Sequence, residues 1–258
     1  MPEIITGLDI GSSQVKCVVA EKQKDGSLKI ISAVKEPSLG LRRGVLVDAE
    51  YALSTLAKLV SELKASSKNS TKNLYVNFQS EHTKVRISRG ISAVSQPDKE
   101  IKQEDIDRAV QSSRAAKMLP NFRVLHTIVR EFLVDEIGDI IFSPLGMTGS
   151  RLEVTTLIAE AFSPHLDVLT KTLGAAGVNP GGIVFNPFAA SKAVLSKKQK
   201  ELGVIMIDLG AHTTSIAVFE ENKPLFAKSF PVGSNHITKD IAIGLRVPVD
   251  VAEKIKKL

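Results

Sequence analysis

One pattern of residues occurs twice in this chain, and the repetition constrains the fold more than any other feature. In the first copy, residues 4–13, an apolar run ends in Asp-Ile-Gly and two serines. In the second copy, residues 204–214, a similar run ends in Asp-Leu-Gly and a short polar stretch. After each copy come two apolar segments separated by an acidic turn, which predict strands, and then an amphipathic segment, which predicts a helix. The sequence therefore predicts two similar α/β lobes joined in one chain.

The composition agrees with a globular protein of this kind. The chain has 258 residues, of which 43% are hydrophobic and 24% charged, so it can bury a substantial core. Its single cysteine, Cys17, excludes an internal disulfide framework and a cysteine-rich zinc site. No run of 18 apolar residues predicts a membrane-spanning helix, and the first residues lack the features of a signal peptide. We therefore expect a cytoplasmic protein.

The net charge of +6 does not by itself indicate a nucleic-acid partner. The basic residues are scattered in short groups, and no basic stripe is interleaved with aromatic side chains. We expect no nucleic-acid binding, and an anionic membrane surface or a phosphate ligand is the better expectation for the basic charge.

The segments between and around the two copies predict three parts. Residues 1–80 together with 159–197 form the first lobe, residues 81–158 an inserted subdomain, and residues 198–258 the start of the second lobe. Within the insertion we expect short strands at 85–88 and 91–94, a helix at 102–119, and further strands at 124–134 and 152–159. A polar connector at 196–201 marks the boundary between the lobes. Residues 253–258 have the pattern of the middle of a helix, so we expect the natural chain to continue.

The two Asp-x-Gly turns are suited to binding a nucleotide. Small residues allow backbone N–H groups to approach phosphate oxygens closely, and serine and threonine hydroxyls can donate further hydrogen bonds. An aspartate at the end of each strand supplies a hard oxygen for a hydrated Mg²⁺ ion. One such turn alone is a weak signal, but two in matched surroundings predict that a polyphosphate is held between them.

These motifs and their order resemble the actin-like ATPases, the group that includes actin, heat-shock chaperones and sugar kinases. Within that group the chain is most similar to the FtsA family of bacterial cell-division proteins. The resemblance rests on residues 6–13, 43–48, 144–153 and 235–245, with Pro248 and residues 252–256 completing the set. It implies the actin-like (ribonuclease H-like) fold, with two duplicated βββαβα lobes and an inserted small α+β subdomain of the 1C, or SHS2, type.

The resemblance also implies a function. Members of this family bind ATP, polymerise into protofilaments, and link FtsZ filaments to the inner face of the cytoplasmic membrane. Their inserted subdomain contacts neighbouring protomers and later division proteins. The FtsZ-binding subdomain and an amphipathic membrane helix would both follow Leu258. The expected location is therefore cytoplasmic and peripheral on the cell membrane.

Matching the family motifs residue by residue implies a site for ATP and Mg²⁺. Asp9 and Asp208 would hold the metal through water, and Asp208 and Asn186 are the candidate catalytic residues. The residues implied to bind the nucleotide are Asp9, Gly11, Ser12, Ser13, Asp208, Gly210, Ala211, Thr213, Thr214, Gly233, Glu253 and Lys256. The helix that begins after Gly233 would favour a phosphate at its N-terminus. Glu253 and Lys256 share one helix face, and a simple surface pair is an equal alternative for them.

Three departures from the family pattern bear on activity. Ala211 and His212 replace glycines of the second phosphate turn, and Ser215 stands where an acidic residue is common. Many relatives carry a glutamate that positions the attacking water, and Asn186 stands at that place. Because an asparagine can hold a water but cannot act as a general base, we expect binding with at most weak ATPase activity.

Two other functions remain open at this point. A PilM-like scaffold of type IV pilus assembly would share the fold and the inserted subdomain, and the Gly-Ala-x-Thr-Thr form of the second turn suits it. Residues 146–152 and 44–48 favour cell division instead. An actin-fold sugar kinase would need a substrate-binding domain and a suitably placed aspartate base, and the sequence indicates neither.

Overall fold

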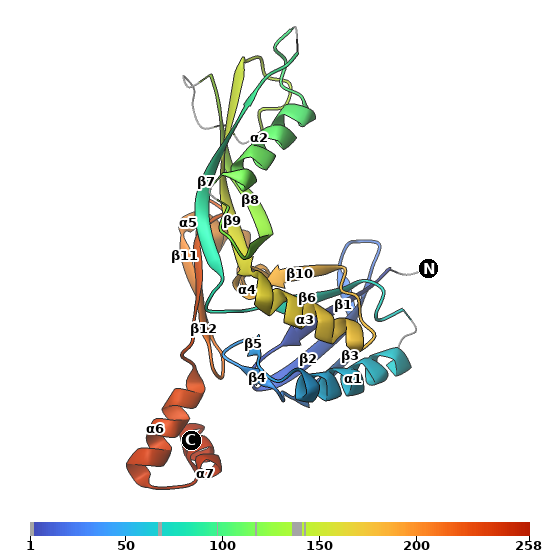
Figure 1. The fold of residues 1–258 in the computed structure, drawn as a ribbon, viewed down its shortest axis with the longest axis vertical. Coiled ribbons are helices and arrows are strands. Elements are labelled where there is room, and N and C mark those ends of the chain that lie inside the picture. Colours follow the sequence, from blue (N-terminus) through green and yellow to red (C-terminus); the bar gives the residue numbers. More distant parts are fainter. Residues whose placement is uncertain (1–2, 67–68, 97, 117, 136–140, 142) are drawn as a thin grey trace.

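The computed structural model describes the greater part of the chain, namely residues 3–66, 69–96, 98–116, 118–135, 141 and 143–258. It is elongated, with the inserted subdomain extending from one end and the last two helices at the other (Figure 1). The N-terminal lobe lies to one side of this long axis (Figure 1). This arrangement places the two repeated turns between the lobes.

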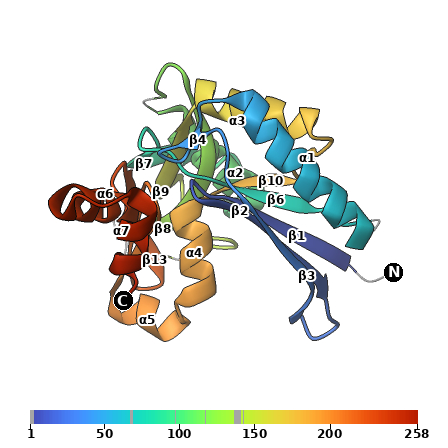
Figure 2. The same cartoon turned by 90° about the horizontal axis from the view of Figure 1, so that it is seen from below.

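The first lobe is built on a five-stranded sheet of order β10-β6-β1-β2-β3. The strands are β1 (Glu3–Ile10), β2 (Gln14–Lys22), β3 (Leu28–Pro37), β6 (Leu74–Phe78) and β10 (Gly182–Phe185). The first three are antiparallel, whereas β6 runs parallel to both β1 and β10. Helices α1 (Ala49–Ser66) and α3 (Ser163–Ala175) lie side by side on one face of the sheet (Figure 2). A small hairpin of β4 (Leu41–Arg42) and β5 (Val45–Leu46) precedes α1.

Local signals in the sequence explain where α1 begins and what it packs against. The Asp48 carboxylate accepts the backbone N–H groups of Glu50 and Tyr51, both at 3.2 Å, as expected for an N-cap. The face of α1 that meets the sheet is apolar and buried, and it comprises Ala52, Leu56, Leu59, Val60 and Leu63. Cys17 is also buried in this core, as its alternating strand position predicts.

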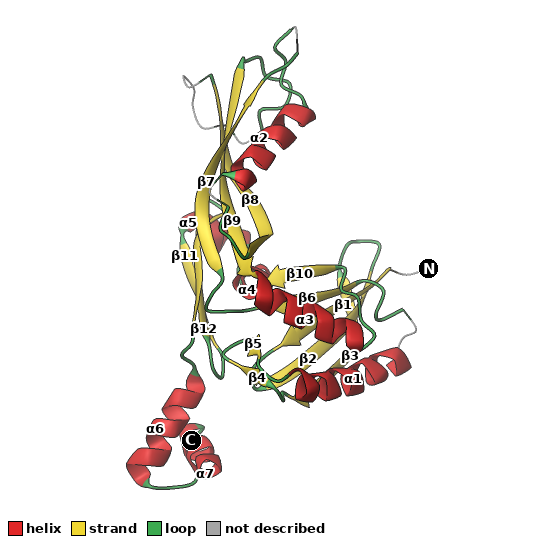
Figure 3. Ribbon diagram, in the orientation of Figure 1, coloured by secondary structure: helices red, strands yellow, loops and turns green. Residues whose placement is uncertain are grey.

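The inserted subdomain is a three-stranded antiparallel sheet with one helix packed on it (Figure 3). Its elements are β7 (Lys84–Ala93), α2 (Gln103–Ala115), β8 (Phe122–Val134) and β9 (Arg151–Phe162), and the strand order is β7-β9-β8. The expectation of two short strands at 85–88 and 91–94 is wrong, because β7 is continuous. Gly90, which lies between the two expected strands, packs under α2: a Cβ there would be 2.1 Å from the Ala109 carbonyl oxygen.

Two other boundaries in the insertion differ from the expectation. Helix α2 ends at Ala115 rather than near 119, and β9 continues to Phe162 rather than ending at 159. The β9 extension is explained by its partners, since Phe162 still pairs with Phe122 of β8. Tertiary pairing thus prolongs a strand beyond the point that local alternation predicts.

The second lobe repeats the beginning of the first. Its strands are β11 (Val204–Leu209), β12 (Thr214–Glu220) and β13 (Lys223–Phe230), and the helices α6 (Ser234–Leu245) and α7 (Val249–Lys256) follow. The connector before it contains α4 (Asn186–Val194) and α5 (Lys197–Leu202). The polar connector expected at 196–201 is largely helical, since α5 occupies most of it. Ser196 and Gln199 form a reciprocal capping box that starts α5, a signal that the sequence contains.

A shared core joins the lobes and the insertion. Phe185 and Phe188, at the start of α4, pack with Leu157 and Ala159 of β9 and with Met206, Ala217, Phe219 and Ala227 of the second lobe. Their rings meet edge to face at a centroid distance of 5.5 Å. Asn186, the first residue of α4, directly follows Phe185, so this core holds it where the two repeated turns approach each other.

Candidate functional site

The two Asp-x-Gly turns have the same backbone construction. In the first turn Asp9 pairs with Lys16 across the strands, and the Gly11 N–H donates to the Gln14 carbonyl at 3.1 Å. In the second turn Asp208 pairs with Ser215, and the Gly210 N–H donates to the Thr213 carbonyl at 2.9 Å. The duplication seen in the sequence is therefore preserved residue for residue in the register of both hairpins.

Each turn needs its glycine because the chain passes too close for a side chain. A Cβ at Gly11 would lie 2.8 Å from the Gln14 carbonyl oxygen, and one at Gly210 would lie 3.0 Å from that of Thr213. Both contacts are to backbone atoms, which cannot move away without opening the turn. The glycines thus keep both turns tight, with their backbone close to the space between them.

The turns face a common cavity of about 320 Å³. The described residues that line it are Asp9, Gly11, Ser12, Ser13, Gln14, Lys16, Gln79, Asn186, Asp208, Leu209, Gly210, Ala211, Thr213 and Ser234. Lys16 is the sole lysine or arginine among them, so two carboxylates face one ammonium group. A phosphate chain would meet net negative charge there unless a divalent cation came with it.

The Asp9 carboxylate lies among competing influences. Its withdrawal from solvent raises the pKa, the Lys16 ammonium at 3.7 Å lowers it, and the charge of Asp208 raises it again. The net direction is upward from the usual value for an aspartate. A cation placed between the two carboxylates would favour the ionised form of Asp9.

The donor set fits a hydrated magnesium ion. No group of three or more potential ligands among histidine, cysteine, aspartate and glutamate occurs in the described part of the chain. Two carboxylates with hydroxyl groups nearby do not make a full protein cage, and Mg²⁺ keeps several waters and is bound by one or two carboxylates plus phosphate oxygens. Asp9 and Asp208 are the residues that would hold it.

Asn186 links the second carboxylate to the first lobe. Its Nδ2 donates to Asp208 Oδ2 at 2.8 Å, and its Oδ1 accepts a hydrogen bond from Asn77 Nδ2 at 3.2 Å. The same Asn77 nitrogen donates to Asp9 Oδ1 at 2.5 Å. The two carboxylates are therefore connected through two side-chain amides.

Nine of the implied site residues line the cavity, and four do not. Those in the lining are Asp9, Gly11, Ser12, Ser13, Asn186, Asp208, Gly210, Ala211 and Thr213. Thr214 instead donates its hydroxyl to the Val232 carbonyl at 2.6 Å. Gly233 lies behind the second turn, where a Cβ would be 2.6 Å from the Gly210 carbonyl oxygen. Both support the turn from outside the cavity.

The start of α6 holds the second turn. The N–H groups of Ser234 and Asn235 donate to the carbonyls of Gly210 and Ala211, both at 2.9 Å. These first donors of the helix are therefore already used within the protein. The dipole of α6 still lies behind the turn, and Ser234 reaches the cavity lining.

Glu253 and Lys256 also lie outside the cavity lining and tie α7 to α6. Lys256 Nζ contacts Glu253 Oε2 at 2.5 Å and Thr238 Oγ1 at 2.8 Å, and Thr238 donates to the same carboxylate at 2.6 Å. Hydrogen bonds from Lys256, Thr238 and Lys257 lower the pKa of Glu253 to about 2. The two side chains thus share one face, as their spacing predicts.

Sequence reasoning missed several residues of the cleft. Gln14, Lys16, Gln79, Leu209 and Ser234 line it, and Asn77 lies behind the two carboxylates. Lys16 could have been found from the hairpin register, since it must pair with Asp9. Gln79 could not, because its Nε2 reaches across to Thr213 at 2.9 Å and Ser215 at 2.7 Å in the other lobe.

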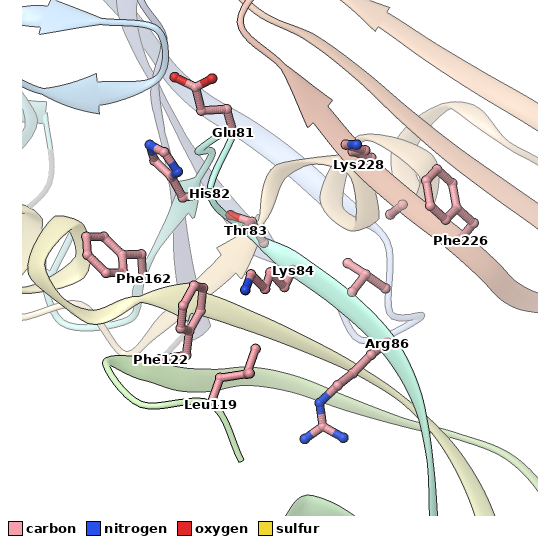
Figure 4. Close-up of a pocket in the computed structure, with 12 residues that line it drawn as sticks. Glu81, His82, Thr83, Lys84, Arg86, Leu119, Phe122, Phe162, Phe226 and Lys228 are labelled. Carbon is pink, nitrogen blue, oxygen red and sulfur yellow. The ribbon is translucent and has the colours of Figure 1, made fainter. Parts of the chain in front are cut away.

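A larger cavity of about 710 Å³ lies at the base of the inserted subdomain. Figure 4 shows Lys84, Phe122 and Leu119 on one side and Phe226 with Lys228 of β13 on the other. The Lys84 ammonium lies 4.7 Å from the centroid of the Phe122 ring, a cation–π contact. Apolar walls and ammonium groups give this cavity a different chemistry from the cleft between the turns.

Solved structures place the chain in a fold class. It matches a PilM-PilN type IV pilus biogenesis complex with a TM-score of 0.68 at 18% identity, covering 98% of this chain and 69% of the other. It matches MreB 5 of Spiroplasma citri bound to AMPPNP with a TM-score of 0.53 at 14% identity, covering 100% and 63%. The two lobes, the paired turns and these likenesses define the actin-like ATPase fold with an inserted SHS2-type subdomain, as the sequence predicts.

Sequence comparison then identifies the family. The family model described as "SHS2 domain inserted in FTSA" matches residues 80–159. The family model described as "Cell division protein FtsA" matches residues 205–258. The cell division protein FtsA of Borreliella burgdorferi is 34% identical over 98% of this chain, and that of Bacillus subtilis 33% over 99%. The chain belongs to the FtsA family of cell division proteins. It spans 61% and 58% of the length of these two relatives.

Within the residues that the structure describes, no helix has both the length and the apolar character needed to cross a membrane.

Proposed function

We propose that this chain binds ATP with Mg²⁺ in the cleft between the two turns. The observation that carries the proposal is the matched pair of tight glycine turns, each with an aspartate in the same register, facing one cavity. Asp9 and Asp208 would hold the ion through water, and the Ser12, Ser13 and Thr213 hydroxyls would donate to phosphate oxygens. The bound ion supplies the positive charge that Lys16 alone does not provide.

The surroundings of Asn186 favour binding over rapid hydrolysis. A side-chain amide has no basic atom that can take a proton from water, and this one already donates to Asp208 and accepts from Asn77. We propose at most weak ATPase activity, with nucleotide acting to hold the two turns together across the cleft.

Thermal unfolding tests the binding. ATP with Mg²⁺ should raise the melting temperature, because a ligand that binds the folded state alone stabilises it. ATP with a chelator should raise it less, and the D208A variant should lose most of the effect. The K197A variant in α5, away from the cleft, is the control. An unchanged melting temperature in the wild-type chain would overturn the proposal.

We propose further that the protein acts as a cell-division scaffold. It would polymerise, tether FtsZ filaments to the inner face of the cytoplasmic membrane, and recruit later division proteins through the inserted subdomain. Membership of the FtsA family supports this role. The residue ranges proposed for the parts are 1–80 with 159–197, 81–158 and 198–258, and the separate core of Ile101, Ala109, Phe132, Leu152 and Val154 supports the middle one.

The competing function is a pilus-assembly scaffold, which the likeness to the PilM-PilN complex favours. Co-sedimentation of the natural full-length protein with FtsZ filaments and lipid vesicles separates the two. The cell-division proposal predicts that the protein pellets with FtsZ and brings vesicles with it. Failure to pellet with FtsZ under conditions where the protein binds ATP would leave pilus assembly as the better reading.

A further inference from the structure

The side chain of Asn77, near the end of β6, is oriented by the backbone of the neighbouring strand. The Ile10 N–H donates to Asn77 Oδ1 at 2.7 Å. A backbone N–H can only donate, so the oxygen of the Asn77 amide must face Ile10. Its nitrogen then faces the other way, toward Asp9 and Asn186, and donates to both. This orientation follows from the hydrogen-bond pattern itself.

The orientation of Asn77 in turn fixes that of Asn186. Asn186 Oδ1 accepts from Asn77, so the Asn186 nitrogen must face Asp208, to which it donates at 2.8 Å. A chain of donors therefore runs from the Ile10 backbone to Asn77, from Asn77 to Asp9 and Asn186, and from Asn186 to Asp208. It begins in the first turn and ends in the second.

We infer that Asn77 is a positioning residue that orients both metal-facing carboxylates, Asp9 directly and Asp208 through Asn186. The inference rests on the proposed function, because it concerns how the chain prepares its own carboxylates for a hydrated divalent ion. One oxygen of each carboxylate is held by an amide, which limits the rotation of the carboxylate and defines where its other oxygen lies. Ordering these groups before the ion arrives lowers the entropy cost of binding it.

The chemistry at position 77 is specific to an amide. An aspartate there could accept from Ile10 but could not donate to Asp9 or Asn186, and it would add a third carboxylate to the pair. An alanine would leave Asp9 and Asn186 without this donor. The alanine also leaves the Ile10 N–H without its acceptor, which lowers stability. The loss of the donor to Asp9 and Asn186 is expected to fall on the metal-dependent part of binding.

Nucleotide affinity measured with and without Mg²⁺ tests this role. The dissociation constant of a fluorescent ATP analogue is measured for the purified protein in Mg²⁺ and in EDTA, and the ratio gives the gain from the ion. N77A should reduce that gain by about tenfold, the loss expected for one hydrogen bond to a charged group. The affinity in EDTA should change little, whereas the melting temperature of the ligand-free protein should fall, because the buried Ile10 N–H loses its acceptor.

Asn73, just before the same strand and outside the cleft lining, provides the matched control. N73A should leave the ratio unchanged. If N77A leaves the ratio of the dissociation constants in EDTA and in Mg²⁺ unchanged, Asn77 is only structural and the inference is wrong. An equal loss of affinity in both conditions is one form of that result. If the wild-type chain binds no nucleotide in either condition, the proposed function fails and this inference fails with it.

A double-mutant cycle tests the route through Asn186. If Asn77 acts on Asp208 through Asn186, the N77A/N186A variant should lose less of the Mg²⁺-dependent gain than the sum of the two single variants. Additive losses would overturn the route to Asp208. The melting temperatures of the same three variants show whether each of them is folded.

Discussion

The two repeated turns share a backbone but differ in what surrounds them. In the first turn the residue opposite the aspartate is Lys16, whose side chain is 56% exposed and whose ammonium lies 3.7 Å from Asp9. In the second turn the corresponding residue, Ser215, is fully buried. The duplication has thus kept the glycine and the carboxylate, and it has placed the cation in one copy only.

The turns also differ in how they are held. The first is supported within its own lobe, where the Gly44 N–H donates to the Ser12 hydroxyl at 3.1 Å. The second depends on the other lobe, because Gln79 donates to Thr213 and Ser215. Within the second lobe, the Ser215 hydroxyl pairs with that of Ser229 at 3.1 Å. The second turn, whose aspartate is opposite a buried serine, therefore makes the contact between the lobes, whereas the first turn has a lysine at the cleft.

Exchanging the residues opposite the aspartates should have the largest effect. S215K would force a long side chain into the fully buried position where Ser215 meets Gln79 and Ser229. Overpacking together with the loss of these hydrogen bonds should cost about 3–5 kcal/mol of unfolding free energy. The reverse exchange, K16S, removes an exposed ion pair and should cost less than about 1 kcal/mol. Urea denaturation of the two variants measures both. Equal losses would show that the turns are equivalent.

A second comparison concerns the glycines. G11A and G210A each force a Cβ against a carbonyl oxygen of the same turn, at 2.8 and 3.0 Å, and should cost about 1–3 kcal/mol each, as for other overpacked sites. G7A, in the strand before the first turn, is the control, because a Cβ there meets nothing within 4 Å. We expect the loss in G11A to be at least that in G210A. A G11A variant as stable as G7A would contradict the tight-turn interpretation.

Much of the fold could be predicted because local patterns and tertiary contacts agree. The strands of both copies, the capped helix α1 and the helix after Asn186 all follow from alternation, caps and proline positions. The predicted strand bounds are wrong where contacts with another element of the fold determine them. Gly90 lies between two predicted short strands, yet the strand continues through it because α2 packs against it. Phe162 stays in a strand because it still pairs with β8.

The candidate site was predictable to a similar extent. The aspartates, glycines and hydroxyls of the turns are local motifs, and they line one cavity. Asn77 and Gln79 were not found, because their partners are 68 and 134 or more positions away in the chain. Asn77 interrupts the otherwise apolar segment 74–78, which is the sole local signal that the side chain has a polar partner.

The smallest expected effect concerns His212, which stands in the second turn where the first has Ser13. Burial and the nearby charges of Lys239, His236 and Arg42 lower the pKa of His212. Below an ordinary histidine pKa of about 6.5 the unfolded chain therefore takes up a proton that the folded chain does not, and stability falls as the pH drops toward the lower folded value. H212S, which copies the first turn, removes this contribution.

We therefore expect the melting temperature of the wild-type protein to fall between pH 7.5 and 5.5 by about 1 °C more than that of H212S, since the imidazole is partly exposed and the effect is screened. His126 and His165, whose pKa values burial also lowers, contribute equally to both proteins and cancel in the difference. An identical fall in both proteins would show that the buried Nδ1 of His212 is no obstacle to protonation, and that the second turn tolerates a charge as the first does.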